Sequence, residues 1–312
     1  MKSPLLVAAA AIENEQGQVL IAKRPDQVDQ GGLWEFPGGK LAPFETGLQA
    51  LKRELHEELG IDVMKARPLI RVQHRYPEMK VLLDVWKVTA FSGEAWGKEG
   101  QPVRWVDVAR LPSYNFPAAN EAIIKAIRLP DSYVITDGCK DQQASIKRLT
   151  ACLNRGYKLI QLRAPDLDAE SYRCLAQRFQ EVCDQAGAEL ILNADPELLK
   201  QVKAAGVHLN ARRLAEVKQR PLAKDLWVAA SCHTAKELKL AQTKGVDFVT
   251  LSPVQPTPTH PGAATLNWQG FKELVEYEAA LPVYALGGLQ PEDRSRVFAL
   301  GGQGVAGISH FW

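Results

Sequence analysis

The chain has 312 residues, which is enough for two domains of ordinary size. Hydrophobic residues make up 46% and charged residues 24%, as in ordinary globular proteins. The formal net charge of +2 excludes a broad basic field, so we expect no direct contact with nucleic acid. The five cysteines contain no CxxC pair, and this favours a reducing, cytoplasmic compartment over a disulfide framework.

The first apolar run, residues 5–12, has the length of a strand, whereas a membrane span needs about 20 apolar residues. The run follows Lys2 and resembles the core of a signal peptide, but no small-residue cleavage site comes after it. Residues 18–23 instead read as a second strand, so we expect a hairpin and no membrane partner. Further strands are predicted over residues 68–75, 80–90 and 103–107.

A helix predicted over residues 46–59 carries signals at both ends. Thr46 can cap its start, and Gln49 can complete a capping box. Gly60 can end it in a left-handed turn. One apolar stripe on this helix is expected to pack on a sheet, and it consists of Leu48, Leu51, Leu55 and Leu59.

The neighbouring face of this helix is acidic. Glu54, Glu57 and Glu58 lie close together on it, with only Arg53 among them. Like charges three or four residues apart cost about 0.2–0.5 kcal/mol per pair. One interpretation is a solvated acidic face. The other is a hard-oxygen site for Mg²⁺, with Mn²⁺ as the alternative ion, completed by a backbone carbonyl at Gly38.

The residues around this helix have a particular spacing: Gly39, five residues, Glu45, seven residues, Arg53-Glu54-Leu55, one residue, Glu57-Glu58, one residue and Gly60-Ile61. This spacing resembles the signature of the Nudix hydrolases at every defining position. The resemblance implies an α/β/α sandwich that hydrolyses a nucleoside diphosphate linked to another group. It implies that the last three glutamates serve the metal site or activate water. Arg53 would orient these glutamates, and Glu45 would support the loop.

Three flanking stretches resemble those of the MutT-type 8-oxo-dGTP diphosphatases and extend the likeness over about residues 4–129. They are WEFPGGK (34–40), GEAWGKEGQP (93–102) and NFPAANEAII (115–124). The resemblance implies that Glu99 joins the catalytic and metal-binding residues. The substrate-binding residues that it implies are Arg24, Glu35, Phe36, Pro37, Gly38, Lys40 and Asn120. Among these, Phe36 would offer its ring to the base. Asp29 departs from the pattern, because the MutT type usually has a histidine there.

Asn120 has a specific chemical reason to read an oxidised purine. Oxidation of guanine at C8 puts a proton on N7, so the base edge then offers O6 as an acceptor and N7–H as a donor. A carboxamide has one acceptor and two donors, and it matches both groups together. Ordinary guanine would leave the amide oxygen facing a lone pair. The alternative is that Asn120 only caps the helix predicted over residues 120–128.

The pattern changes after a short break at residues 129–131. Apolar strands then alternate with helical stretches, which is typical of a parallel sheet covered by helices. Eight such units predict a (β/α)₈ TIM-type barrel. The predicted strands cover residues 133–137, 158–164, 188–194, 206–210, 226–232, 248–254, 282–288 and 304–310.

The barrel lacks a clear last helix, because few residues follow its eighth strand. An apolar outer strand face needs a cover. We expect the N-terminal domain or a helix near the linker to provide it. The other candidates are a second subunit, or Phe311 and Trp312 folding back.

The second half contains the stretches QLRAP (161–165), LNAD (192–195), GVHLN (206–210), ASCHT (230–234), SPVQPTPTH (252–260), LGGL (286–289) and GVAGIS (304–309). In order and spacing they resemble thiamine phosphate synthase and the related thiazole tautomerases. Barrels often bind phosphate after strands seven and eight. This implies a phosphate site at Gly287, Gly288 and Ser309.

The departures from this family concern its charged groups. Ala164 and Pro165 stand where the synthases have a lysine soon after the arginine, here Arg163. The other departures are Ala194 before Asp195, the segment 210–213 in place of a metal-binding aspartate, and His260 in place of a lysine. We therefore expect a catalytically degenerate barrel. A tautomerase that uses His233 and a non-enzymatic phosphate-ligand sensor remain as alternatives, and Cys232 is expected to be a buried small side chain.

The sequence therefore predicts a Nudix hydrolase domain over residues 1–130 and a degenerate barrel over residues 131–312. The expected reaction is the Mg²⁺-dependent hydrolysis of 8-oxo-dGTP to 8-oxo-dGMP and pyrophosphate, which sanitises the nucleotide pool. The expected partner is thus a small nucleoside triphosphate. The alternative substrate is a thiamine-related diphosphate. Nothing in the sequence specifies an oligomeric state.

Overall fold

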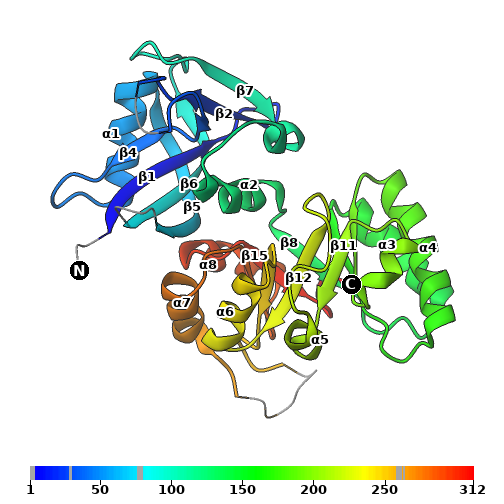
Figure 1. Cartoon of the computed structure of the whole chain (residues 1–312). Helices are drawn as coiled ribbons and strands as arrows, with labels where there is room; N and C mark the ends of the chain where they lie inside the picture. The colour runs from blue at the N-terminus through cyan, green and yellow to red at the C-terminus, as the bar shows by residue number, and fades with distance from the viewer. Residues whose placement is uncertain (1–3, 28–29, 76–79, 258–261, 263) are drawn as a thin grey trace. The chain divides into compact units, whose positions relative to one another are not determined.

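The computed structural model describes residues 4–312 with the exception of 28–29, 76–79, 258–261 and 263. The side chain of residue 75 is also excluded. Asp29 and His260 lie outside the described residues. The chain divides into two compact units, Met1–Arg128 and Leu129–Trp312, which Figure 1 draws from blue to cyan-green and from green to red. Within the described residues, no helix is both long and apolar enough to cross a membrane.

The first unit contains two sheets (Figure 1). The larger has the order β4-β1-β6-β5, in which β1 runs parallel to β6 and the other neighbours are antiparallel. Its strands are β1 Leu5–Ile12, β4 Gly38–Lys40, β5 Asp62–Arg75 and β6 Lys80–Ser92. The smaller sheet consists of β3 Trp34–Glu35, β2 Gln18–Lys23 and β7 Val103–Asp107.

Strand β1 separates two hydrophobic cores because its side chains alternate between the sheet faces. Ala8, Ala10 and Ile12 pack with the leucines of helix α1 (Gly47–Leu59). Ala9 and Ala11 belong to a second core, which includes residues of helix α2 (Glu121–Arg128). A helix therefore packs on each face of the sheet, and the predicted α/β/α sandwich is confirmed.

The ends of α1 follow the predicted signals. Thr46 caps the helix and forms a reciprocal capping box with Gln49, and Gly60 ends it in the left-handed conformation. Helix α2 begins at Glu121, one residue later than predicted, because a short 3₁₀ turn, η2 Ala118–Asn120, precedes it. Another 3₁₀ turn, η1, spans Val108–Ser113. Strand β5 begins at Asp62 and is longer than predicted.

The second unit is a closed eight-stranded parallel barrel, as predicted. Its strands are β8 Ser132–Ile135, β9 Leu159–Leu162, β10 Glu189–Leu192, β11 Gly206–Leu209, β12 Trp227–Cys232, β13 Phe248–Leu251, β14 Val283–Leu286 and β15 Gly304–Gly307. Helices follow most strands. They are α3 Gln142–Asn154, α4 Ala169–Gln185, η3 Pro196–Lys200, α5 Ala211–Glu216, α6 Ala235–Thr243, α7 Asn267–Tyr277, η4 Pro291–Asp293 and α8 Arg294–Ala299.

The barrel strands are apolar on both faces, which explains their continuous hydrophobic runs. Aromatic side chains fill the interior, where Tyr133, Phe248 and Tyr284 pack against one another. The alternate residues point outward and form the core beneath the helices.

No helix follows β15 within the described residues, as predicted. Phe311 is fully buried there, and its ring lies against Gly307 so closely that a methyl group on Gly307 would overlap it. Trp312 stacks on Phe179 with ring centroids 6.0 Å apart. The two aromatics thus fold back onto their own unit, which was one of the covers considered from the sequence.

Candidate functional site

Arg53 holds together three of the glutamates of the predicted site. Its Nε and Nη2 atoms donate to Glu45 at 3.0 and 2.9 Å. Its Nη1 atom donates to Glu54 at 2.8 Å and to Glu57 at 3.1 Å. The hydrogen bonds with Arg53, and next the Ala42 amide, lower the pKa of Glu45. Arg53 therefore binds carboxylates on the acidic face of α1 through hydrogen bonds.

The loop before α1 brings its backbone against the same carboxylates. Gly39 lies directly against Glu54, and a methyl group at this position would overlap the carboxyl group. The Gly38 amide donates to Glu58 Oε2 at 3.2 Å. Lys40 has an exposed side chain, and its carbonyl accepts from Arg53 at 3.1 Å. The pairing of β4 with β1 fixes this loop.

Glu58 is the glutamate with the most perturbed acidity. Burial raises its pKa to about 7, and the charges of Glu54, Glu99 and Glu35 also raise it, while the Gly38 amide opposes them. Burial and neighbouring carboxylates both favour the neutral form of a carboxyl group, and Glu58 experiences both.

Glu99 reaches this cluster through a loop that is tied to the end of α1. The Lys98 amide and the Gln101 side chain both donate to the Glu58 carbonyl, at 2.9 and 3.1 Å. Gln101 also accepts from the Glu99 amide at 3.0 Å. Glu99 itself is exposed, and its charge acts on Glu58.

The predicted metal ligands are near one another but are not gathered around one point. Among the described residues, no three acidic, histidine or cysteine side chains form a group that could hold a metal ion as they stand. The carboxylates instead accept hydrogen bonds from Arg53 and from the Gly38 amide. These hydrogen bonds offset part of the repulsion between the like charges. The ligand atoms that the cluster offers are all oxygens, which are the ligand atoms that hard divalent cations prefer. The donor set therefore fits a hard divalent cation.

The residues expected to contact the nucleotide lie in different surroundings. Arg24 forms an ion pair with Glu35, whose pKa is raised by burial against the opposing effect of Arg24. Phe36 is only 4% exposed, and its ring stacks on Phe116 at 5.3 Å. Its ring thus belongs to a hydrophobic core of this unit. Pro37 is buried, and its carbonyl accepts from the β1 backbone.

Asn120 is buried, with 7% of its surface exposed. Its backbone amide bonds to Pro117, but no hydrogen bond of its side chain is found among the described residues. A helix cap is defined by a hydrogen bond between its side chain and the helix backbone. In the described part of the chain Asn120 shows no such bond to α2, so the structure does not support the interpretation that it merely caps this helix.

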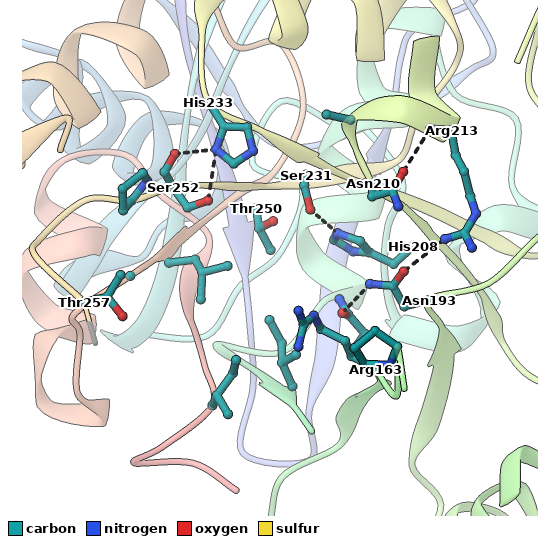
Figure 2. A pocket seen from close by; sticks show the side chains of 18 of the residues that line it. Arg163, Asn193, His208, Asn210, Arg213, Ser231, His233, Thr250, Ser252 and Thr257 are labelled. Carbon is teal, nitrogen blue, oxygen red and sulfur yellow. Dashed lines mark hydrogen bonds between the residues drawn. The ribbon is translucent and has the colours of Figure 1, made fainter. Parts of the chain in front are cut away.

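The second unit has a cavity of about 790 Å³ at the carboxyl ends of the barrel strands. Figure 2 shows the polar side chains that line it, among them Arg163, Asn193, Arg213 and Thr250. Arg163 directly follows β9 and Asn193 directly follows β10, so the ends of neighbouring strands bring both side chains to the same rim. This is the end at which barrel enzymes bind their ligands.

A chain of hydrogen bonds runs from the cavity into the barrel. Arg213 donates to Asn193, Asn193 donates to Gln161, and Gln161 donates to Tyr133, at 3.2, 3.2 and 2.9 Å. Tyr133 bonds Nδ1 of His208 at 3.3 Å, and Ser231 bonds Nε2 at 2.8 Å. Figure 2 shows the bond between His208 and Ser231. Burial lowers the pKa of His208 to about 3, so its ring is neutral at pH 7.

This network was not predicted from the sequence. His208 and Ser231 lie in stretches that carry the family resemblance, but no role was expected for either residue. Tyr133 and Ser231 lie far apart along the chain, and only barrel closure brings both to His208. The signal that could have found them is a polar residue at an inward position of an otherwise apolar strand.

Of the phosphate-site residues expected in the barrel, Gly287 lines the cavity, whereas Gly288 and Ser309 are not among its described lining residues. His233 lies at the rim, and its Nδ1 atom contacts the Ser252 carbonyl at 2.7 Å. Cys232 is fully buried, and burial raises its pKa to about 12, so it is an inert small side chain as expected.

Comparison with known proteins divides the chain at the same place. A NUDIX domain model matches residues 8–126, and a Thiamine monophosphate synthase model matches residues 132–311. The 8-oxo-dGTP diphosphatase of Escherichia coli is 36% identical over 124 residues, which are 40% of this chain and 96% of that protein. The CTP pyrophosphohydrolase of the same organism is 36% identical over 122 residues, 39% of this chain and 90% of that protein.

The second unit has relatives of its own. The thiamine-phosphate synthase of Thioalkalivibrio sulfidiphilus is 31% identical over 185 residues, which are 58% of this chain and 87% of that protein. The glutamates around Arg53 and the barrel cavity thus lie in two separately matched segments. The chain belongs to the Nudix family through its N-terminal unit and to the thiamine monophosphate synthase family through its C-terminal unit.

Proposed function

We propose that the N-terminal unit hydrolyses 8-oxo-dGTP to 8-oxo-dGMP and pyrophosphate, and so keeps oxidised guanine nucleotides out of DNA. The observation that carries this assignment is the Asn120 side chain, which is buried and has no hydrogen bond within the described part of the chain. A carboxamide held open in this way can donate to O6 and accept from N7–H of the oxidised base.

Sequence identity alone does not choose the substrate. An 8-oxo-dGTP diphosphatase and a CTP pyrophosphohydrolase are equally similar to this unit, at 36% identity. The hydrogen-bonding pattern at Asn120 favours the oxidised purine, because a buried polar group left facing a like group is costly.

The glutamate cluster supplies the reaction's charged groups. Arg53 fixes Glu54 and Glu57, and the Gly38 amide positions Glu58. Glu99 approaches from the loop tied to the end of α1. These four carboxylates, with the Gly38 carbonyl, would hold Mg²⁺.

When bound, the ion neutralises phosphate charge and supplies an activated water. The residues around it have a positioning task, since release of pyrophosphate and a nucleoside monophosphate requires the water to approach one phosphorus in line. Arg53 keeps two carboxylates from swinging away, and the Gly39 backbone leaves the room that Glu54 occupies.

Steady-state kinetics of the full-length protein with Mg²⁺ test the substrate assignment. The panel contains 8-oxo-dGTP, dGTP, CTP and thiamine diphosphate. We expect kcat/KM to be highest for 8-oxo-dGTP, by about 10–100-fold over dGTP, which corresponds to one mismatched buried polar group. A preference for CTP would overturn the assignment, and a preference for thiamine diphosphate would support the alternative substrate.

A further inference from the structure

Two arginines on the barrel cavity lack a counter-charge. Arg163 is half-buried, and its guanidinium has no hydrogen-bond or ion-pair partner among the described residues. Arg213 is also half-buried, and its guanidinium donates only to the neutral amide of Asn193. No aspartate or glutamate is found among the described residues that line the cavity.

The third arginine at this cavity differs from these two. Arg212 is exposed, and it lies 3.7 Å from Glu216 in an ordinary surface ion pair. Arg163 and Arg213 therefore stand apart as cations that face the cavity without a carboxylate. A half-buried guanidinium without an anion is unfavourable, and its planar set of donors matches phosphate oxygens.

An unsatisfied hydroxyl group points to the same conclusion. Thr250 is fully buried on β13, lines the cavity, and its Oγ1 atom has no hydrogen-bond partner. Figure 2 shows it on the cavity wall between Ser231 and Ser252. Buried hydroxyls are normally paired, so an unpaired one on a cavity wall indicates a missing ligand.

The cavity does not fit the divalent cation that synthases of this family need. The segment after β11 would have to supply a carboxylate, but here Asn210 caps α5 and Arg213 turns its side chain to the cavity. The nearby Asp195 is not free to serve either, because it caps η3 by accepting from the Glu197 amide at 2.9 Å. A guanidinium thus stands where the family places a metal-binding acid.

We propose that the barrel cavity binds a small molecule bearing a phosphate or diphosphate group without a divalent cation, with Arg163 and Arg213 supplying the positive charge. The cavity volume of about 790 Å³ suits a small molecule. The hydrogen bonds from Arg213 through Asn193 to Gln161 hold its guanidinium in place before the ligand arrives.

Isothermal titration calorimetry of the full-length protein with inorganic pyrophosphate in EDTA tests this proposal. EDTA removes the ion that the Nudix glutamates would need, so those carboxylates repel the probe. We expect binding in EDTA, where the barrel cavity is the site that remains able to bind the probe. Arg163→Gln and Arg213→Gln should each weaken binding by about 10–100-fold, as expected for a lost charged hydrogen bond.

One control variant and one further test variant accompany these two. Arg178→Gln removes an exposed positive charge from α4 and should leave the affinity unchanged. Thr250→Val should weaken pyrophosphate binding without lowering the melting temperature, since the hydroxyl has no protein partner. The proposal fails if pyrophosphate does not bind in EDTA, if binding needs Mg²⁺, or if the Arg178→Gln variant loses as much affinity as the two cavity variants.

Discussion

Gly39 and Glu54 are in such close contact that the glutamate carboxyl group occupies the space where any other residue would place its β-carbon. Arg53 holds this carboxyl from the other side at 2.8 Å. Gly39→Ala should therefore displace Glu54 from its bond with Arg53. We expect kcat to fall by about 10²-fold, the usual cost of misplacing a catalytic group by about 1 Å.

The fold should survive this substitution, because the overlapping atoms are the end of a flexible side chain. Circular dichroism and thermal melting of Gly39→Ala check that point beside the kinetics. Gly270→Ala is the matched control, since a methyl group there meets only Leu266 at an ordinary 3.6 Å. Wild-type kcat in Gly39→Ala would show that the position of Glu54 is unimportant for turnover.

Replacing Glu54 by Gln removes one negative charge from the cluster and keeps its shape. We expect hydrolysis of 8-oxo-dGTP at saturating Mg²⁺ to fall by at least about 10²-fold, in line with the loss of a preorganised charged group. Glu94→Gln removes an exposed carboxylate outside the cluster and should be neutral. Near-wild-type turnover by a folded Glu54→Gln variant would contradict the assignment of this cluster as the catalytic site.

Asn120 can be tested through the difference between two substrates. If its amide donates to O6 and accepts from N7–H, Asn120→Ala should weaken the transition-state binding of 8-oxo-dGTP by about 1–3 kcal/mol. The loss for dGTP should be much smaller, because dGTP lacks the N7–H group. The ratio of the two kcat/KM values measures this directly. Equal losses for the two nucleotides would instead indicate a structural role for Asn120.

The sequence predicted the helices and strands well where side-chain periodicity is strong. It missed β4, because the three residues of Gly38–Lys40 have too few side chains to show a period. Most of the predicted barrel strands also ran past their true ends. The strand predicted over residues 158–164 stops at Leu162, and Arg163 then turns to the cavity. Hydropathy cannot mark the point at which a buried strand becomes a binding rim.

The candidate sites divide in the same way. The proximity of Arg53 to the three glutamates of α1 was predictable, because all four residues lie within two turns of one helix. Phe36 was expected to offer its ring to a base, but its stacking on Phe116 depends on a contact between segments distant in sequence. The bond between Tyr133 and His208 joins two strands that are not neighbours in the barrel, and no local pattern specifies it.

His208 makes the stability of the barrel sensitive to acid. Its pKa is about 3 in the folded state and 6.5 without burial, so the unfolded chain binds more protons between these values. The stabilisation is therefore complete above pH 6.5 and declines as the pH falls toward 3. At about 1.4 kcal/mol per pH unit, about 2 kcal/mol is lost at pH 5.

Denaturant unfolding at pH 7 and pH 5 measures this effect. His208→Gln should be less stable than the wild type at pH 7 but should lose less stability on acidification, because it has no ring to protonate. The control is His310→Gln, at an exposed position, which should keep the wild-type difference. An unchanged difference in His208→Gln would mean that other groups cause the acid sensitivity.

Phe311 packs against the last barrel strand, β15. Phe311 is fully buried against Gly307, and its ring centroid lies 5.9 Å from that of Tyr157. The Phe311 carbonyl accepts a hydrogen bond from the Cys152 thiol at 3.2 Å. Phe311→Ala should reduce the free energy of unfolding of the barrel by about 3–5 kcal/mol, the usual cost of truncating a buried phenylalanine. Denaturant unfolding followed by circular dichroism measures it. Tyr277→Ala, at an aromatic that is 74% exposed in the same unit, should cost far less. Equal and small losses in the two variants would show that the cover of β15 does not depend on Phe311.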